Sequence, residues 1–325
     1  MREIVCPDLN VALEQWRDEG FRLDSIYPAD DPQAAVLTRA GETIRLMTRP
    51  DVPHATDELP PFKPEFVLTR AGNEAGEGRA GMLYRDLIPS RLGGRYIASH
   101  IAIQQGGPVA DWVHFHRIAF QVIYVRRGWV RVVYEDQGEP FVMEPGDLVL
   151  QPPEIRHRVL ESSPGLEVVE ITCPALHETC ADHEMDLPNG ANPERGFGEQ
   201  HFLHHVAART PWTAFRGGQA QETAINDAAG GLAEVRTIRG GSIDFPGHDG
   251  ELVFGFVLDG SVRLNVGDGF ALASGDAFVI PPAEAWSLGD ATDDFRLLHV
   301  TTARLDYRST PVLFYSLTDH PRGIA

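Results

Sequence analysis

The sequence predicts a mainly β protein with two β-barrel or sandwich domains in tandem, preceded by a small α+β module. Its 325 residues are enough for two domains of ordinary size. It contains 32 glycines and 24 prolines, and short β-branched and aromatic runs recur between turn signals, which favours barrels or sandwiches. An internal repeat, described below, indicates that the β-rich block occurs twice.

The composition argues against several classes of protein. With 47 acidic and 28 basic residues the formal net charge is −19, which repels nucleic-acid phosphates. No stretch has the roughly 20 apolar residues of a membrane span, and the charged start of the chain does not resemble a signal peptide. Three cysteines are too few for a disulfide framework. We therefore expect a soluble cytoplasmic protein that acts on a small molecule.

Residues 1–50 are predicted to form the α+β module. The segment Val11–Trp16 favours a short helix, with Asn10 as its N-cap and Gly20 as its stop signal. Three short strands follow, in FRLDSIYP, AAVLTR and ETIRLMTR. The module contains no set of metal ligands, so we expect a role in packing or dimerisation.

The rest of the chain divides into four segments. Residues 51–65 contain four prolines and several acids, which is typical of a linker. Residues 66–175 form the first β-rich block, 176–210 an irregular connection, and 211–325 a second block with a tail. The connection is rich in histidine but has no ordered ligand pattern, so we expect it to pack over a barrel or a partner subunit.

The second β-rich block repeats the first. GWVRVVYE precedes PGDLVLQPP in the first block, and GSVRLNVG precedes SGDAFVIPP in the second. The interval from the Gly-Asp pair, which begins at Gly146 or Gly275, to the Pro-Pro pair is the same in both blocks. Only the loop before the Gly-Asp pair differs in length. The sequence therefore indicates a duplicated β domain.

Three histidines of the first block form a candidate metal site. His114 and His116 are two residues apart on a β-rich run, so their side chains lie on the same face of a strand. His157 follows a Pro-Gly-Asp turn and a second apolar run. Neutral imidazoles that converge from neighbouring strands are good metal ligands. Gln121 lies an odd number of residues after His116, so on a regular strand its side chain would face the other side. A bulge or turn in RIAF must therefore intervene if Gln121 also points inward.

These residues resemble the first motif of the cupin superfamily. That motif has His-x-His, then a glutamate after four residues and a glycine after six more. His114, His116 and Gly128 occupy matching positions, and Gln121 stands where the family usually has the glutamate. The duplication makes the chain similar to the bicupins.

The second cupin motif is matched in part. Gly146, Pro152 and His157 fit it, whereas Glu154 replaces a glycine and Glu161 replaces an asparagine. The resemblance covers roughly residues 65–175 and 211–315. It implies two double-stranded β-helix (jelly-roll) barrels, with His114, His116 and His157 as metal ligands. It also implies a homodimer, because bicupins often pair.

Alignment of the two repeats predicts that the C-terminal barrel is degenerate. Only one histidine remains in the second block. The counterparts of His114, His116, His157 and Gln121 are, in that order, Pro246, His248, Trp286 and Val253. One imidazole cannot hold a catalytic metal. The C-terminal barrel is therefore expected to serve as a scaffold, a dimerisation face or a second ligand pocket.

The resemblance implies one divalent metal and a choice of reactions. Fe(II) is favoured, with Zn, Ni, Mn or Cu as alternatives, because imidazole selects weakly among them. Related three-histidine cupins include dioxygenases, which implies a mononuclear non-haem Fe(II) dioxygenase for a small carboxylated, enolisable or aromatic substrate. Gln121 would orient the substrate or act as a weak fourth ligand. The alternatives are an oxygen-independent isomerase, lyase or hydrolase, and a metal-containing small-molecule binding protein.

Five further residues are candidates for substrate binding. A cationic side chain inside the barrel would recognise a substrate carboxylate. The alternative for each is an ordinary place on a strand. The candidates are His100, Trp112, Tyr124, Arg126 and Arg131.

Overall fold

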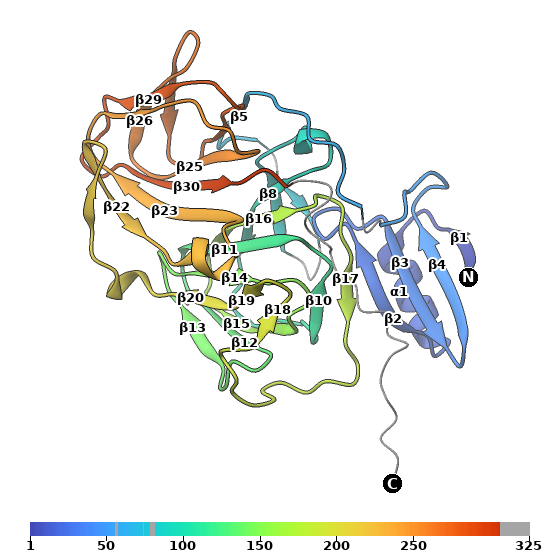
Figure 1. Ribbon diagram of the computed structural model, residues 1–325. Coiled ribbons are helices and arrows are strands. Elements are labelled where there is room, and N and C mark those ends of the chain that lie inside the picture. Colours follow the sequence, from blue (N-terminus) through green and yellow to red (C-terminus); the bar gives the residue numbers. More distant parts are fainter. Residues whose placement is uncertain (56–57, 74, 79–81, 306–325) are drawn as a thin grey trace.

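The computed structural model describes residues 1–55, 58–73, 75–78 and 82–305, and they form a mainly β structure. Figure 1 shows the N-terminal module on one side of the N-terminal barrel and the C-terminal barrel on another. The predicted fold class is confirmed. No described helix is long and apolar enough to cross a membrane.

The N-terminal module is one helix on a four-stranded sheet. Helix α1 begins at Leu9, two residues before the predicted start, because the Asp8 carboxylate accepts a hydrogen bond from the Val11 amide at 3.0 Å. Asp8, and not Asn10, is therefore the N-cap. The predicted strands are confirmed, and a further one precedes the helix. The elements are β1 (Arg2–Val5), α1 (Leu9–Asp18), β2 (Arg22–Tyr27), β3 (Ala34–Arg39) and β4 (Glu42–Met47).

The N-terminal barrel consists of two facing sheets. One has the order β20-β14-β11-β16-β8-β7-β6, and the other continues from the module through β17-β10-β15-β12-β13, with β9 paired to β15. Strands β17 (Thr179–Ala181) and β20 (Leu203–His205) come from the segment after the barrel. The strands of the barrel are β6 (Gly76–Glu77), β7 (Leu83–Asp86), β8 (Ile97–Ile103), β9 (Gly107–Pro108), β10 (His114–His116), β11 (Phe120–Arg127), β12 (Val130–Tyr134), β13 (Phe141–Met143), β14 (Leu148–Gln151), β15 (His157–Ser162) and β16 (Leu166–Cys173), with a short 3-10 helix, η2 (Arg91–Gly93).

The segment 176–210 is more ordered than predicted. Its strand β17 (Thr179–Ala181) pairs with β2 of the module on one side and β10 of the barrel on the other. The module and the barrel thus share one continuous sheet (Figure 1). The other elements here are β18 (Gly196–Phe197), β19 (Gln200–His201), β20 (Leu203–His205) and the 3-10 helix η3 (Ala207–Arg209).

The C-terminal barrel repeats the architecture in sheets β21-β22-β23-β30-β25-β28-β5 and β24-β29-β26-β27. The predicted tail beyond Leu305 lies outside the described residues. The elements are β21 (Thr213–Phe215), β22 (Gly218–Glu222), α2 (Ile225–Ala228), β23 (Ala233–Arg239), β24 (Ile243–Phe245), β25 (Val253–Asp259), β26 (Ser261–Asn265), β27 (Phe270–Ala273), β28 (Ala277–Val279), β29 (Trp286–Gly289) and β30 (Arg296–Thr302).

The two barrels exchange edge strands, which corrects the predicted domain boundaries. Strand β5 (Val67–Thr69) precedes the N-terminal barrel but pairs with β28 of the C-terminal barrel. Strand β20 precedes the C-terminal barrel but pairs with β14 of the N-terminal one. Each exchange covers an edge that would otherwise expose unpaired backbone groups. Residues 67–69 therefore belong to the second barrel's sheet, and 203–205 to the first barrel's.

A shared core joins the barrels. On β11, Val122 and Tyr124 pack with Phe254 and Leu298 between the two large sheets, whereas Val125 packs inside the N-terminal barrel. This alternation is the period-two pattern of a strand that is buried on both faces. It fixes which side chains can reach the interior of each barrel.

The repeated glycines have a shared geometric reason. Gly128 and Gly260 both have positive φ, 72° and 67°, and a β-carbon at either would collide with a hydroxyl oxygen, of Ser163 or Thr292 respectively. Glu154, which replaces the motif's glycine, also has positive φ (61°), and so does Ala283 at the corresponding place (66°). The second motif therefore keeps its backbone shape without its glycine.

Candidate metal centre

Three histidines of the N-terminal barrel converge as the sequence predicted. His114 pairs directly with His157 across β10 and β15, and His116 lies two residues further along the same face. One ring nitrogen of each lies within 4.8 Å of the others, and all three side chains are buried. In the part of the chain that the structure describes, this is the one such group of three His, Cys, Asp or Glu side chains. The geometry suits one metal ion.

Hydrogen bonds orient the three imidazoles. His114 Nδ1 donates to the Trp112 carbonyl at 2.8 Å, and His157 Nδ1 donates to the Ile155 carbonyl at 3.0 Å. His116 Nδ1 lies 3.3 Å from the Thr179 hydroxyl. Ligating histidines commonly engage their second ring nitrogen in this way, which fixes the tautomer and the ring plane. Nε2 of His114 and of His157 therefore carries the lone pair for a metal, and the three residues fit a divalent ion.

Gln121 is buried inside the same barrel. Strand β10 ends at His116 and β11 begins at Phe120, so the predicted break within RIAF is confirmed. The Gln121 amide oxygen accepts a hydrogen bond from Gln151 Nε2 at 2.7 Å, and the Tyr134 hydroxyl donates to Gln151 Oε1 at 2.6 Å. This contact favours an orienting role for Gln121 over that of a metal ligand.

Gln151 is a site residue that the sequence analysis missed, and Tyr134 lies beside it. Gln151 Nε2 lies 3.4 Å from His157 Nε2, and the Tyr134 ring stacks on His157 with centroids 5.4 Å apart. Burial raises the pKa of Tyr134 above its usual range, so its hydroxyl stays protonated and can donate. The alternation of side chains along the strand could have identified Gln151. Leu148 and Leu150 face the other barrel, so Gln151, at the end of the same strand, faces the interior of its own barrel.

Trp112 contributes to the site mainly through its backbone. Its carbonyl holds His114, and its ring lies edge-on to His114 with centroids 5.2 Å apart. The ring also packs against the core of the N-terminal module and lines a cavity of about 330 Å³ between that module and the barrel. Trp112 thus connects the module to the metal centre.

His177, in the connection, is a second neighbour that was not predicted. Its ring lies 5.5 Å from that of His116, and its Nδ1 donates to the Pro174 carbonyl at 3.0 Å. Burial lowers the pKa of His177, so its imidazole is neutral in this apolar setting. The connection therefore packs against the metal centre, as a covering segment was expected to do.

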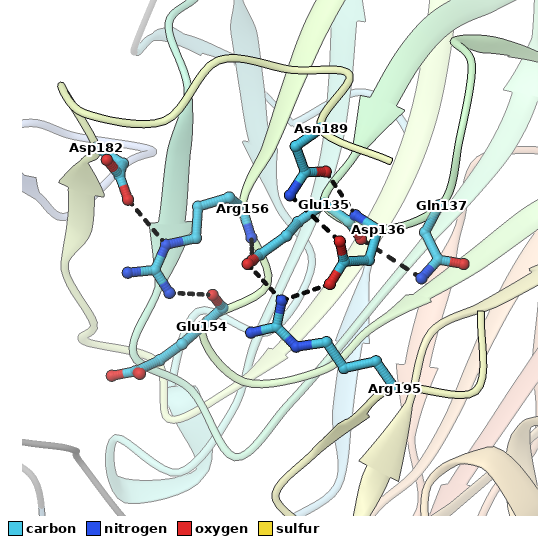
Figure 2. A network of polar contacts seen from close by, with 8 residues as sticks. All are labelled: Glu135, Asp136, Gln137, Glu154, Arg156, Asp182, Asn189 and Arg195. Atoms are coloured by element: carbon cyan, nitrogen blue, oxygen red, sulfur yellow. Dashed lines mark hydrogen bonds and ion pairs between the residues drawn. The ribbon is translucent and has the colours of Figure 1, made fainter. Parts of the chain in front are cut away.

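The outer part of the connection is held by charged groups on the rim of the barrel. Arg195 donates to Glu135 at 2.6 Å and to Asp136 at 2.7 Å, and Arg156 donates to Asp182 at 3.0 Å (Figure 2). Glu135 follows Tyr134 and Arg156 precedes His157, so these ion pairs join the connection to strands that carry the site.

His100, Arg126 and Tyr124 do not reach the metal centre. Both His100 and Arg126 contact Glu167, at 2.9 and 2.8 Å, and lie beside Phe256 of the other barrel. Tyr124 belongs to the core between the barrels, and burial raises its pKa to about 12. Their parity on β8 and β11 points them away from the barrel interior. Their predicted substrate-binding role is therefore corrected to one in the interface between the barrels.

Arg131 is also away from the site. Its guanidinium pairs with Glu161 at 3.1 Å, and both side chains are about 40% exposed, at 42% and 38%. It fits the alternative of a solvated strand residue.

Replacement of Glu167 with glutamine should make the protein less stable in a pH-dependent way. The His100 hydrogen bond, with Arg126 and Arg127, lowers the pKa of Glu167 from 4.5 to about 2, against the effect of burial. A lowered pKa stabilises the fold above pH 4.5, and this stabilisation is lost as the pH falls towards 2. We expect Glu167→Gln to lower the free energy of unfolding by about 1–2 kcal/mol at pH 7. The difference from wild type should shrink between pH 4.5 and 2 in urea unfolding. Glu161→Gln is the exposed control, and a difference that does not change with pH would contradict this assignment.

The strand registers give the C-terminal counterparts directly. Trp286 corresponds to His157 and Val253 to Gln121, as predicted. Trp286 pairs with Phe245 as His157 pairs with His114, so Phe245, and not Pro246, is the structural counterpart of His114. The error of one residue arises because the loops that follow β10 and β24 differ in length. His248 lies in such a loop, and its Nε2 donates to the Ile280 carbonyl at 3.0 Å.

Comparisons with known proteins agree on the fold. No protein-family model matches the sequence, and no curated protein matches it significantly. Among solved structures, an oxalate decarboxylase from Lactobacillus farciminis, in a formate complex, is similar over 73% of this chain and 86% of its own, with a TM-score of 0.54 and 11% identity. Oxalate decarboxylase from Bacillus subtilis is similar over 78% of each chain (TM-score 0.54, 13% identity). Protein Ylba from E. coli is similar over 76% of this chain and 95% of its own (TM-score 0.56, 11% identity).

At such low identity the likeness concerns the fold, and the chemistry has to be argued from the residues of this chain. Those residues are three buried imidazoles that converge in one barrel and are oriented by their Nδ1 contacts. The chain therefore has the tandem-barrel cupin fold, with a three-histidine group in its N-terminal barrel that can hold a divalent metal.

Proposed function

We propose that this protein is a mononuclear non-haem Fe(II) dioxygenase that acts on a small carboxylated, enolisable or aromatic substrate. The observation that carries the proposal is the composition of the metal centre. All three candidate ligands are neutral imidazoles, and the position where a glutamate is usual in cupins holds Gln121. Such a ligand set leaves the charge of a divalent ion uncompensated, which favours an anionic, chelating substrate.

The residues around the metal centre support this role. When bound, Fe(II) would supply a Lewis acid and a redox partner for oxygen. Gln121 and Gln151 offer buried amide groups beside the histidines, and Tyr134 fixes the orientation of Gln151. These amides can position a substrate by hydrogen bonds without adding negative charge.

Oxygen consumption tests the proposal. Protein loaded with one iron per chain would be supplied with β-diketones, hydroxylated aromatic acids and thiols under air. We expect oxygen uptake equal to the substrate consumed for at least one of these classes, and none for His157→Ala. If the iron-loaded protein takes up no oxygen with any of the three classes, the dioxygenase proposal is wrong.

A second candidate is an oxygen-independent metal-dependent lyase. It is favoured by the names of the similar structures, two of which are oxalate decarboxylases. The metal would then act as a Lewis acid on a carboxylate or carbonyl group. Turnover that continues without oxygen, and with Mn or Zn in place of Fe, would favour this candidate over the first.

A further inference from the structure

The C-terminal barrel contains a cavity at the position that the metal centre occupies in the N-terminal barrel. Its volume is about 240 Å³, and its lining includes Phe245, Val253 and Trp286, the counterparts of His114, Gln121 and His157. The apolar counterparts cannot bind a metal. The space has nevertheless not been filled by larger side chains.

His299 is the unusual residue of this cavity. On β30, Leu297 faces the interior of the C-terminal barrel, while Leu298 and Val300 face the other barrel. His299 lies two residues after Leu297, so its side chain also faces the interior. His299 is buried, with 3% of the residue exposed, and neither of its ring nitrogens has a hydrogen-bond partner among the described residues. A polar group that is buried without partners destabilises the fold. A buried imidazole of this kind therefore calls for a ligand or water to satisfy it.

The charged residues that line the cavity are Arg216, Arg236 and Glu234. Arg236 pairs with Glu234 and with Glu222, which offset its charge. Arg216 is exposed, lies over the rings of Phe215 and Phe245, and has no ion-pair partner among the described residues. Burial, with smaller effects of the nearby Arg236 and Arg216, lowers the pKa of His299 to about 3, so its imidazole is neutral.

Aromatic rings form one wall of the same cavity. Phe245 and Trp286 stack in parallel with centroids 3.9 Å apart, and their centroids lie 5.3 and 5.9 Å from that of His299. His248 adds a polar acceptor, because its Nδ1 is buried and has no partner in the part of the chain that the structure describes. A flat apolar wall, the N–H of His299 and the arginine Arg216 match a ligand with a planar body and one negative group.

We propose that this cavity of the C-terminal barrel is a binding site for a small planar carboxylate. Arg216 pairs with the carboxylate at the mouth, and the body of the ligand lies against Trp286 within hydrogen-bonding reach of His299. The site needs no metal, so it is independent of the reaction proposed for the N-terminal barrel.

Calorimetric titration with benzoate as the probe tests this site in the metal-loaded protein. We expect one benzoate per chain at this site, in addition to any that binds the metal centre, and at least about tenfold weaker binding here of benzamide, which has the same shape without the charge. Arg216→Ala should weaken benzoate binding by about tenfold or more, and the exposed control Arg263→Ala should leave it unchanged. His299→Phe should weaken binding while it stabilises the fold, because it removes the unsatisfied imidazole.

The two barrels are distinguished by His157→Ala, which should retain benzoate binding because only the N-terminal site is changed. Loss of benzoate binding in that variant would place the carboxylate at the metal centre and overturn the proposal. Benzoate affinity that is unchanged by both Arg216→Ala and His299→Phe would also overturn it, as would an absence of binding up to about 10 mM.

Discussion

Replacement of His157 with alanine is expected to reduce bound divalent metal from about one ion per chain to below about 0.1. His157 is the one ligand that β15 supplies, and its ring is fixed by the Ile155 carbonyl and by stacking on Tyr134. Its loss leaves two imidazoles from β10, which is too few for the usual catalytic zinc or non-haem iron site. Metal analysis after gel filtration, without added metal, gives the measurement.

The control for this prediction is His201→Ala, which changes an exposed histidine outside the three-histidine group. It should keep the metal content of wild type. A chelator should lower the melting temperature of wild type and of His201→Ala, but should have little effect on His157→Ala. If His157→Ala keeps one metal per chain, the assignment of the ligands is wrong.

Replacement of Arg95 with alanine should lower the free energy of unfolding by about 3–5 kcal/mol. Arg95 forms two hydrogen bonds with Glu251 of the other barrel, at 2.8 and 2.7 Å, and the side chains are only 4% and 6% exposed. The alanine variant leaves the Glu251 carboxylate buried without its cation, and it also removes donors from the Pro60 and Leu305 carbonyls. Urea unfolding followed by circular dichroism measures the loss.

Arg131→Ala provides the matched comparison, because Arg131 and Glu161 form an exposed pair within one barrel. That variant should lose no more than about 1 kcal/mol. The double variant Arg95→Met, Glu251→Leu should recover much of the stability lost by Arg95→Ala, since it leaves no buried charge. Equal effects of Arg95→Ala and Arg131→Ala would show that the buried pair does not hold the barrels together.

The metal centre could be predicted because its signals are local. Two histidines at period two and one histidine after a Pro-Gly-Asp turn are properties of short segments, and their register follows from strand geometry. The duplication could be predicted for the same reason. The alternation of side chains along β11 also excludes Tyr124 and Arg126 from the barrel interior. Both lie an odd number of residues after Gln121, so they point to the opposite side of the strand.

The partners of edge strands and of buried polar groups could not be predicted in this way. Strands β5 and β20 are each three residues long, and nothing within them indicates that they pair with the more distant barrel. The chain of hydrogen bonds from Tyr134 through Gln151 to Gln121 joins three separate strands, so it exists only once the barrel has closed. Such non-local contacts depend on the tertiary fold and leave little trace in sequence periodicity.

The most direct test of the central claim is anomalous X-ray diffraction from crystals of the metal-loaded protein, recorded on both sides of the absorption edge of the metal. We expect one anomalous peak per chain, bound by the imidazoles of His114, His116 and His157, and none in the cavity beside Trp286 and His299. A peak in the C-terminal cavity, or occupied metal elsewhere with none at the three histidines, would contradict it.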